Sequence, residues 1–299
     1  MKKNKRALIG MATAAAILLL SACGSNNNTN SGSNSSASPS ASASASQAAA
    51  AVAPPANLVT SGVLTYGTAA TFPPYEYMKD EKYTGFDIEL GEAIAAQMGL
   101  QVKIEAMNFE GLIPALQGKR IDIINSAMYI KPEREEQVDF VPYMHIGRSI
   151  VVKAGNAKNI HSIDDLSGKT VAVTRGAVEE IYANEQNDIF KSQNKELIKI
   201  LALPTANDAV LATQQGRADA VLHSTPGAAY LLEEMPGEFE IVNSINSDTQ
   251  IGIAIQKGDA NAELKAAIEE ALNNLVADGT YDKLMEKYNL PAEMSLFNK

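Results

Sequence analysis

The sequence predicts an α/β fold in which mainly parallel sheets carry helices on their faces. Short β-rich runs alternate with stretches of helical period along residues 58–299, and this alternation is typical of parallel sheets with covering helices. About 240 residues are enough for one large or two modest lobes. No short internal period is visible, which argues against a repeat solenoid.

The β-rich runs and helical stretches carry this prediction. The strands are expected at Gly62–Gly67, Val102–Glu105, Ile121–Ile124 and Thr170–Val173. The helices are expected at Phe86–Met98, Phe109–Gln117, Val178–Asn187, Asn207–Gln215 and Asn261–Ala277. Gly99, Gly118 and Asp278-Gly279 are stop signals after three of these helices. Pro114 has to be accommodated in the first turns of the second helix.

The amino terminus has the composition of an export signal. An uncharged apolar run, Ala7–Leu20, follows four basic residues and is itself followed by small residues. The run is shorter than the roughly 20 apolar residues that a stable membrane span takes. Residues 1–22 are therefore predicted to be a signal peptide.

The only cysteine stands directly after this segment. Leu20-Ser21-Ala22-Cys23 has the pattern of a bacterial lipobox, which predicts lipidation of Cys23 and a membrane anchor; the alternative is a cleaved secretory peptide with an accidental cysteine. A sole cysteine allows no intrachain disulfide. Residues 24–56 are almost entirely Ser, Asn, Ala, Gly, Thr and Pro, which offer too little apolar area to fold. Residues 23–57 are therefore predicted to be the lipidated cysteine and a disordered tether.

Charge and histidine spacing exclude two kinds of function. The formal net charge is −10, and removal of the signal peptide takes away four basic residues and no acidic ones, giving −14. Nucleic-acid binding draws on clustered Lys and Arg, and no basic stripe is present. His145, His161 and His223 lack metal-ligand spacing. Neither a nucleic-acid partner, a metal nor a cofactor is predicted.

Several motifs recur in a recognisable order. They are Phe72–Tyr77, Tyr83–Leu90, Gly111–Leu116, Pro132–Arg134, Val138–Phe140 and Pro142-Tyr143, followed by Gly168–Val173 and Gly216–Ala220. In order and spacing they resemble the family-3 extracellular solute-binding proteins of polar amino-acid ABC importers. The resemblance covers the chain from Leu58 to Tyr288.

This resemblance implies a two-lobed periplasmic-binding-protein-like fold of type II, with lobes joined by two crossover strands. Lobe 1 would comprise residues 58–150 plus 250–299, and lobe 2 residues 151–249, with crossovers near Arg148–Lys153 and Asp248–Ile253. Together with the predicted lipidation of Cys23, it leads us to expect an extracytoplasmic monomer that is lipid-anchored to the bacterial membrane. The protein would capture an amino acid or related small carboxylate by hinge closure and deliver it to an ABC permease and ATPase.

Arg134 is the first ligand-binding residue that the resemblance implies. In the family, the arginine at this place grips the ligand α-carboxylate, and a planar guanidinium matches two carboxylate oxygens. Taken without the resemblance, Arg134 would be a surface arginine in a Glu-rich turn. Phe72 and Phe109 match aromatic positions that sandwich the ligand's carbon chain in relatives; ordinary core packing is the alternative.

Backbone groups complete the implied site. Ala127 matches a position whose carbonyl receives the ligand ammonium. Gly176, Ala177 and Val178 match a helix start that offers N–H groups to an anion. Relatives usually carry a hydroxyl where Ala177 stands, and Arg175 could compensate, although an exposed salt bridge is the preferred interpretation of that arginine.

Two positions depart from the family pattern. Tyr129 replaces a Thr or Ser that helps to bind the ammonium, and Ser224 replaces an aspartate that faces the same charge. A neutral hydroxyl is about half as strong an acceptor as a carboxylate. Either Tyr129, the Ala127 carbonyl and Ser224 satisfy the ammonium together, or the ligand has no ordinary α-ammonium. His223 could face the cleft and is kept as a possible ligand contact.

An enzyme is the main alternative, because some dehydratases share this fold. Catalysis needs a positioned acid or base, and Ser224 stands where relatives place a cleft acid, so no catalytic residue is predicted. A third class, a sensory domain or a cell-surface binding domain without a role in transport, is not excluded by one sequence.

Overall fold

The computed structural model describes residues 50–245 and 249–297. The predicted signal peptide, Cys23 and most of the predicted tether lie outside these residues, as does Asp248 of the second expected crossover. No helix in the described ranges is both long and apolar enough to cross a membrane. The last predicted tether residues are described, and Val52 is buried, with its N–H donating to the Gln97 carbonyl at 3.0 Å. Ordered packing therefore begins before Leu58.

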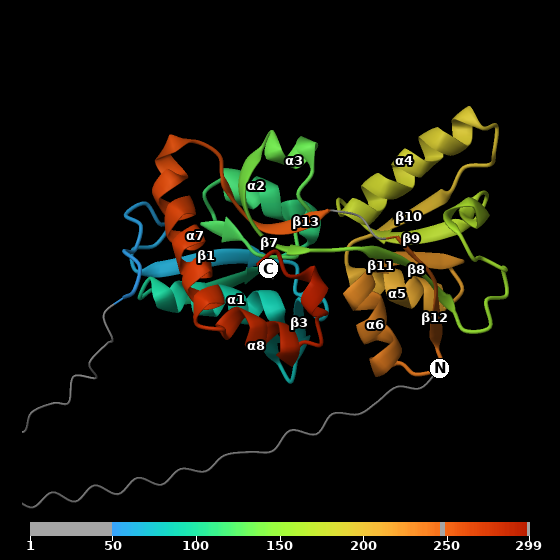
Figure 1. Cartoon of the computed structure of the whole chain (residues 1–299). Coiled ribbons are helices and arrows are strands. Elements are labelled where there is room, and N and C mark those ends of the chain that lie inside the picture. Colours follow the sequence, from blue (N-terminus) through green and yellow to red (C-terminus); the bar gives the residue numbers. More distant parts are fainter. Residues whose placement is uncertain (1–49, 246–248, 298–299) are drawn as a thin grey trace, which may run out of the picture. The chain divides into compact units, whose positions relative to one another are not determined.

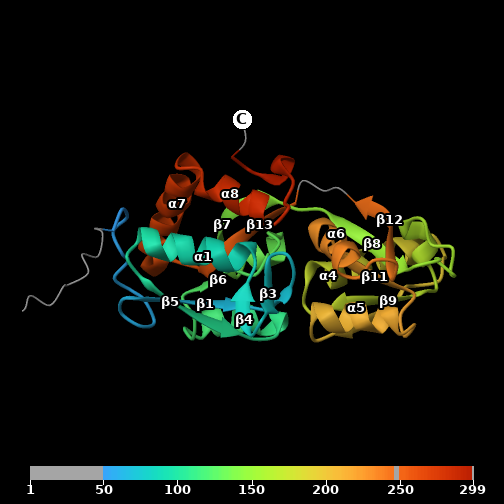
Figure 2. The same cartoon turned by 90° about the horizontal axis from the view of Figure 1, so that it is seen from below.

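Lobe 1 is built on a five-stranded sheet with the order β5-β1-β6-β13-β7. Its strands are β1 (Val63–Thr68), β5 (Gln101–Ala106), β6 (Ile123–Ile124), β7 (Val138–His145) and β13 (Gln250–Gln256). Its helices are α1 (Phe86–Gln97), α2 (Leu112–Gln117), α3 (Pro132–Glu135), α7 (Ala262–Ala277) and α8 (Thr280–Lys287). Figures 1 and 2 show α7, α8 and α1 grouped on this sheet, with the last helices of the chain beside the first.

The two faces of this sheet bury different clusters. Along β13, Ile251, Ile253 and Ile255 pack into the cluster that includes α1, α7 and α8, whereas Ala254 packs into the cluster of α2. Successive strand residues point to opposite faces. A strand that is apolar on both faces therefore lies in the interior of the sheet, between β6 and β7.

Lobe 2 repeats the plan with the strand order β10-β9-β11-β8-β12. Its strands are β8 (Arg148–Lys153), β9 (Thr170–Thr174), β10 (Lys199–Leu203), β11 (Ala220–Ser224) and β12 (Phe239–Ile245). Its helices are α4 (Val178–Ser192), α5 (Ala206–Gln214) and α6 (Thr225–Glu234). Val171 and Val173 face the cluster of α4, and Ala172 faces the cluster of α5 and α6. The expected two-lobed α/β fold is confirmed.

The expectation of mainly parallel sheets is wrong in part. β1 pairs in parallel with β5 and β6, and β9 with β10 and β11. By contrast, β13 runs antiparallel to β6 and β7, and β8 runs antiparallel to β11 and β12. The chain passes from the lobe 1 sheet to the lobe 2 sheet through β7 and β8, and it returns through β12 and β13. Each sheet therefore contains one outgoing and one returning strand, which run antiparallel to each other.

Predicted helices agree with the structure in position more than in length. α4 continues to Ser192, five residues past the expected end at Asn187. The segment expected as one helix at Phe109–Gln117 is a 3₁₀ turn, Phe109–Gly111, followed by α2. Pro114 is the third residue of α2, where its missing N–H leaves no intrahelical bond unmade. A small antiparallel sheet, β2 (Thr71–Phe72), β3 (Glu76–Lys79) and β4 (Lys82–Thr84), was not expected.

Candidate functional site

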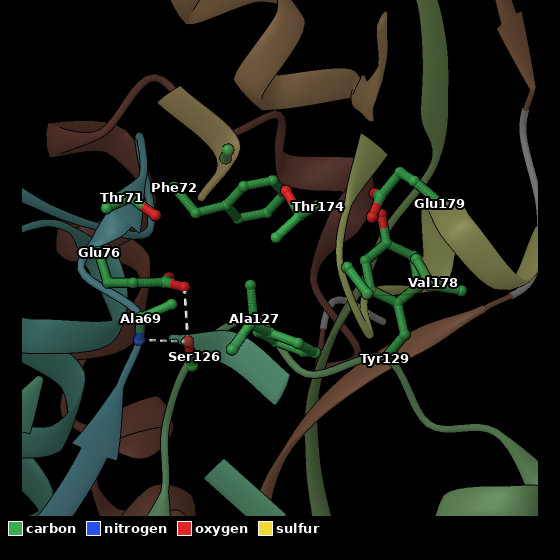
Figure 3. A pocket seen from close by; sticks show the side chains of 13 residues that line it. Ala69, Thr71, Phe72, Glu76, Ser126, Ala127, Tyr129, Thr174, Val178 and Glu179 are labelled. Carbon is green, nitrogen blue, oxygen red and sulfur yellow. Dashed lines mark hydrogen bonds between the residues drawn. The ribbon is translucent and has the colours of Figure 1, made fainter. Parts of the chain in front are cut away.

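A cavity is lined by residues of both lobes, and its empty space of about 350 Å³ includes volume open to solvent. Lobe 1 contributes Ala69, Thr71, Phe72, Glu76, Phe109, Ser126, Ala127 and Tyr129. Lobe 2 contributes Thr174, Ala177, Val178, Glu179 and Ala206. Figure 3 shows these side chains around the pocket. Of the residues implied by the sequence, the cavity brings together Phe72, Phe109, Ala127, Tyr129, Ala177 and Val178. Arg134, Gly176 and Ser224 do not line it.

The two phenylalanines form aromatic walls. Phe72, on β2, stacks on the His223 ring of lobe 2 with ring centroids 4.9 Å apart and planes 5° apart. Phe109 lies under the Arg134 guanidinium, whose central carbon is 5.3 Å from the ring centroid. Both rings are half-buried and border the cavity. The His223 contact is thus with Phe72, and burial lowers the pKa of His223 to about 4, so its ring is neutral at neutral pH.

Asp87 holds the Ala127 turn in place. Ala127 has a left-handed φ of 41°, and its N–H donates to Asp87 Oδ2 at 2.6 Å. The Tyr143 hydroxyl donates to the other carboxylate oxygen at 2.7 Å. Burial raises the pKa of Asp87 to about 6 although both hydrogen bonds lower it. The sequence motif contained Asp87, but nothing in the residue pattern indicated that it supports the cavity wall.

Arg134 is a buried residue and not a surface arginine. Its side chain lies on α3 with 5% of the residue exposed. Nη1 donates to the Tyr129 carbonyl at 2.8 Å, and Nη2 donates to the Gly176 carbonyl at 3.0 Å. Burial lowers the pKa of Arg134 to about 10, which leaves the guanidinium charged at neutral pH. The fork therefore links lobe 1 to the start of α4 in lobe 2.

The start of α4 is already partly hydrogen-bonded. Gly176, with φ at 74°, donates its N–H to Glu180 Oε2 at 2.6 Å, and the Ala177 N–H donates to the Thr174 carbonyl at 3.1 Å. Two of the three amides implied as an anion seat thus have partners of their own. Arg175 forms an ion pair with Glu110 at 3.6 Å on the partly exposed rim, as preferred from the sequence.

Tyr129 and Ser224 use their hydroxyls within the protein. The Tyr129 hydroxyl donates to the Gly147 carbonyl at 3.2 Å, in the connection between β7 and β8. Ser224 is buried and caps α6, where its oxygen accepts the Gly227 N–H at 3.1 Å. A serine followed by a proline in the first helical turn is a start signal for a helix, and this signal in the sequence could have indicated the capping role.

Sequence reasoning missed two buried acids on the cavity wall. Glu76 accepts a hydrogen bond from the Ser126 hydroxyl at 2.8 Å, and burial together with the charge of Asp87 raises its pKa well above the ordinary value. Glu179 is the second residue of α4 and is 3% exposed. Burial raises the pKa of Glu179, whereas Arg148 and Arg134 lower it. The cavity therefore contains two buried acids at positions other than that of Ser224.

The described residues contain no cluster of three or more His, Cys, Asp or Glu side chains that could hold a metal ion. The cavity instead combines aromatic walls, backbone groups, two acids and a buried guanidinium at its margin. Small-molecule sites are mostly apolar cavities with a few placed polar groups. This arrangement is suited to binding a small polar molecule between the lobes.

Comparisons with known proteins identify relatives of this chain. A probable histidine-binding protein of Campylobacter jejuni is 30% identical over 231 residues, which cover 77% of this chain and 86% of the relative. The structure of an ancestral arginine-binding protein bound to arginine is 39% identical with a TM-score of 0.70, and the match covers 76% of this chain and 98% of that one.

A third comparison concerns the enzyme alternative. An ancestral amino acid-binding protein, described as a precursor of cyclohexadienyl dehydratase, is 36% identical with a TM-score of 0.67, over 76% of this chain and 95% of that one. All three relatives are named as binding proteins. Residues 64–291 match the model of one protein family. The chain belongs to that family, the bacterial extracellular solute-binding proteins, family 3.

Proposed function

We propose that this protein is a lipid-anchored, extracytoplasmic receptor that captures an amino acid between its lobes and delivers it to an ABC importer. The observation that carries the proposal is the Arg134 guanidinium, buried beside an aromatic-walled cavity and bonded to backbone of both lobes. A guanidinium fork fits a carboxylate better than it fits two separate carbonyls. A ligand carboxylate is therefore expected to replace one or both carbonyls.

Hinge closure is the proposed mechanism. An amino acid would first bind lobe 1 through Arg134 and the Phe72 and Phe109 walls, and lobe 2 would then close with the Gly176–Val178 segment. Contacts between the lobes, such as Lys131 with Glu185 at 3.5 Å and Arg175 with Glu110 at 3.6 Å, support a closed arrangement. Both pairs are at least partly exposed to solvent, so each contributes little. Contacts with the bound ligand can then supply the free energy that favours the closed form over the open form.

Isothermal titration calorimetry of the purified full chain with each common amino acid tests the binding proposal. Saturable binding of at least one amino acid is expected, because relatives are named for histidine and arginine. Failure of every amino acid to bind would contradict it. Metabolic labelling with a radioactive fatty acid tests the anchor: label is expected on the wild-type chain and absent from Cys23→Ala.

A dehydratase is the second candidate, favoured by the buried Glu76, whose raised pKa suits a general acid. The relatives' names favour binding over catalysis. Mass spectrometry of each bound compound after incubation with the protein separates the two functions. Recovery of the unchanged compound is expected. A dehydrated product formed in molar excess over the protein would establish that the protein is a dehydratase.

A further inference from the structure

Glu179 is a buried acid with an unused acceptor. It lines the cavity from lobe 2 and is 3% exposed. Among the described residues, its Oε1 atom has no hydrogen-bond partner. Figure 3 places the Glu179 and Glu76 carboxylates on opposite sides of the pocket. A buried carboxylate oxygen without a donor costs free energy that a donor arriving in the cavity would recover.

Two buried arginines favour the charged form of this carboxylate. Arg148, at the start of β8, and Arg134 both act on it electrostatically. Within the ranges that the structure describes, neither arginine forms an ion pair with it. Arg148 lies over the Tyr182 ring instead, 4.4 Å from the centroid. The two arginines thus favour the carboxylate anion of Glu179, and its Oε1 atom remains without a donor among the described residues.

Two other side-chain acceptors of lobe 2, Ser224 and Asp219, already have hydrogen-bond partners. The Ser224 hydroxyl caps α6 and does not border the cavity. Asp219 accepts the Thr170 N–H at 2.9 Å and pairs with Lys158 at 3.7 Å. Among the cavity-lining residues that lobe 2 contributes, Glu179 is the one acid.

We propose that Glu179 is the acceptor for the ligand's α-ammonium group. The assignment rests on the proposed function, in which Arg134 binds the α-carboxylate. An amino acid carries both groups on one carbon, so its binding site needs an anion close to its guanidinium. Glu179 meets this need because it lines the cavity three residues after Gly176, whose carbonyl accepts the Arg134 Nη2 hydrogen bond at 3.0 Å. The Glu179 carboxylate thereby takes the place of the aspartate that Ser224 replaces. The ligand is then an amino acid with an ordinary α-ammonium group.

The test compares L-arginine with 5-guanidinopentanoic acid, which lacks only the α-amino group. Calorimetry on the full chain gives the ratio of the two affinities for the wild type, for Glu179→Gln and for Asp188→Asn. Asp188 is an exposed acid on the same helix and is the matched control for loss of one charge. If another common amino acid binds more tightly, that amino acid and its own des-amino analogue replace the pair.

The wild type is expected to prefer the amino acid, and Glu179→Gln should reduce this preference about 10- to 150-fold, the range for one charge-assisted hydrogen bond. Asp188→Asn should leave it unchanged. Equal weakening of both ligands in Glu179→Gln would show that the carboxylate only balances the arginines, and an unchanged ratio would also overturn the assignment. Absence of any wild-type binding contradicts the proposed function instead.

Glutamine matches glutamate in shape, so the variant should fold, and thermal unfolding without ligand checks this. If Glu179→Gln does not fold, Glu179→Asp tests the assignment instead. Aspartate keeps the negative charge, but its side chain is one methylene shorter and holds the carboxylate farther from the ligand. A reduced preference for the amino acid in Glu179→Asp supports the assignment, and a wild-type ratio overturns it.

Discussion

Substitution of Arg134 by lysine keeps the positive charge and removes the fork. In the structure, Nη1 and Nη2 reach two carbonyls, of Tyr129 at 2.8 Å and of Gly176 at 3.0 Å. A lysine has a single nitrogen and cannot span both positions, nor can it bind two carboxylate oxygens side by side. One charge-assisted hydrogen bond is worth about 1.5–3 kcal/mol. The affinity for the amino acid is therefore expected to fall about 10- to 150-fold.

Calorimetric titration of the amino acid into Arg134→Lys and into wild type measures this loss. Arg120→Lys is the matched control, since Arg120 is an exposed arginine of the same lobe, and its affinity should equal that of the wild type. Thermal unfolding of each variant without ligand separates loss of binding from loss of fold. Wild-type affinity in a folded Arg134→Lys protein would refute the reasoning that the fork holds the ligand.

Further predictions concern stability. An acid whose pKa is raised by folding binds its proton more tightly in the folded state, so stability falls as pH rises. Between about pH 5 and pH 8, the melting temperature of Glu76→Gln should therefore rise relative to that of the wild type as pH rises. A constant difference in melting temperature, or the same trend in the exposed Glu269→Gln, would contradict this prediction. Ser224→Ala should lower the unfolding free energy by about 0.5–2 kcal/mol through loss of the cap, whereas Ser224→Asp keeps a capping oxygen. Neither change should alter ligand affinity, and a tenfold loss in the stable Ser224→Asp protein would place Ser224 in the site. A chain that begins at residue 57 should be less stable than one that begins at residue 47, by about 1.5 kcal/mol for the lost burial of Val52; equal urea midpoints would show that this contact contributes nothing.

Local patterns predicted individual elements better than strand direction. The apolar stripe after Phe86 and the stop at Gly99 located α1, because a helix and its end depend on neighbouring residues. The directions of β8 and β13 depend on which sheet the chain has left and which it joins. That information lies in contacts between distant segments, such as β13 with β7.

The site shows the same division between local and distant information. Motif resemblance identified Phe72, Phe109 and Ala127, which border the cavity. It did not separate Glu179 from Glu180, two adjacent acids in the first turn of α4. One is buried in the cavity and the other is bonded to the Gly176 N–H outside it. The choice depends on which side of the helix start faces lobe 1, and the short run of sequence around it does not fix this.

The central claim is that an amino acid binds between the lobes with its carboxylate on Arg134. A crystal structure of the protein loaded with its tightest-binding amino acid tests it most directly. The claim predicts both carboxylate oxygens within hydrogen-bonding distance of the guanidinium, with the ligand chain between Phe72 and Phe109. A ligand bound elsewhere, with Arg134 still donating to the Tyr129 and Gly176 carbonyls, would contradict it.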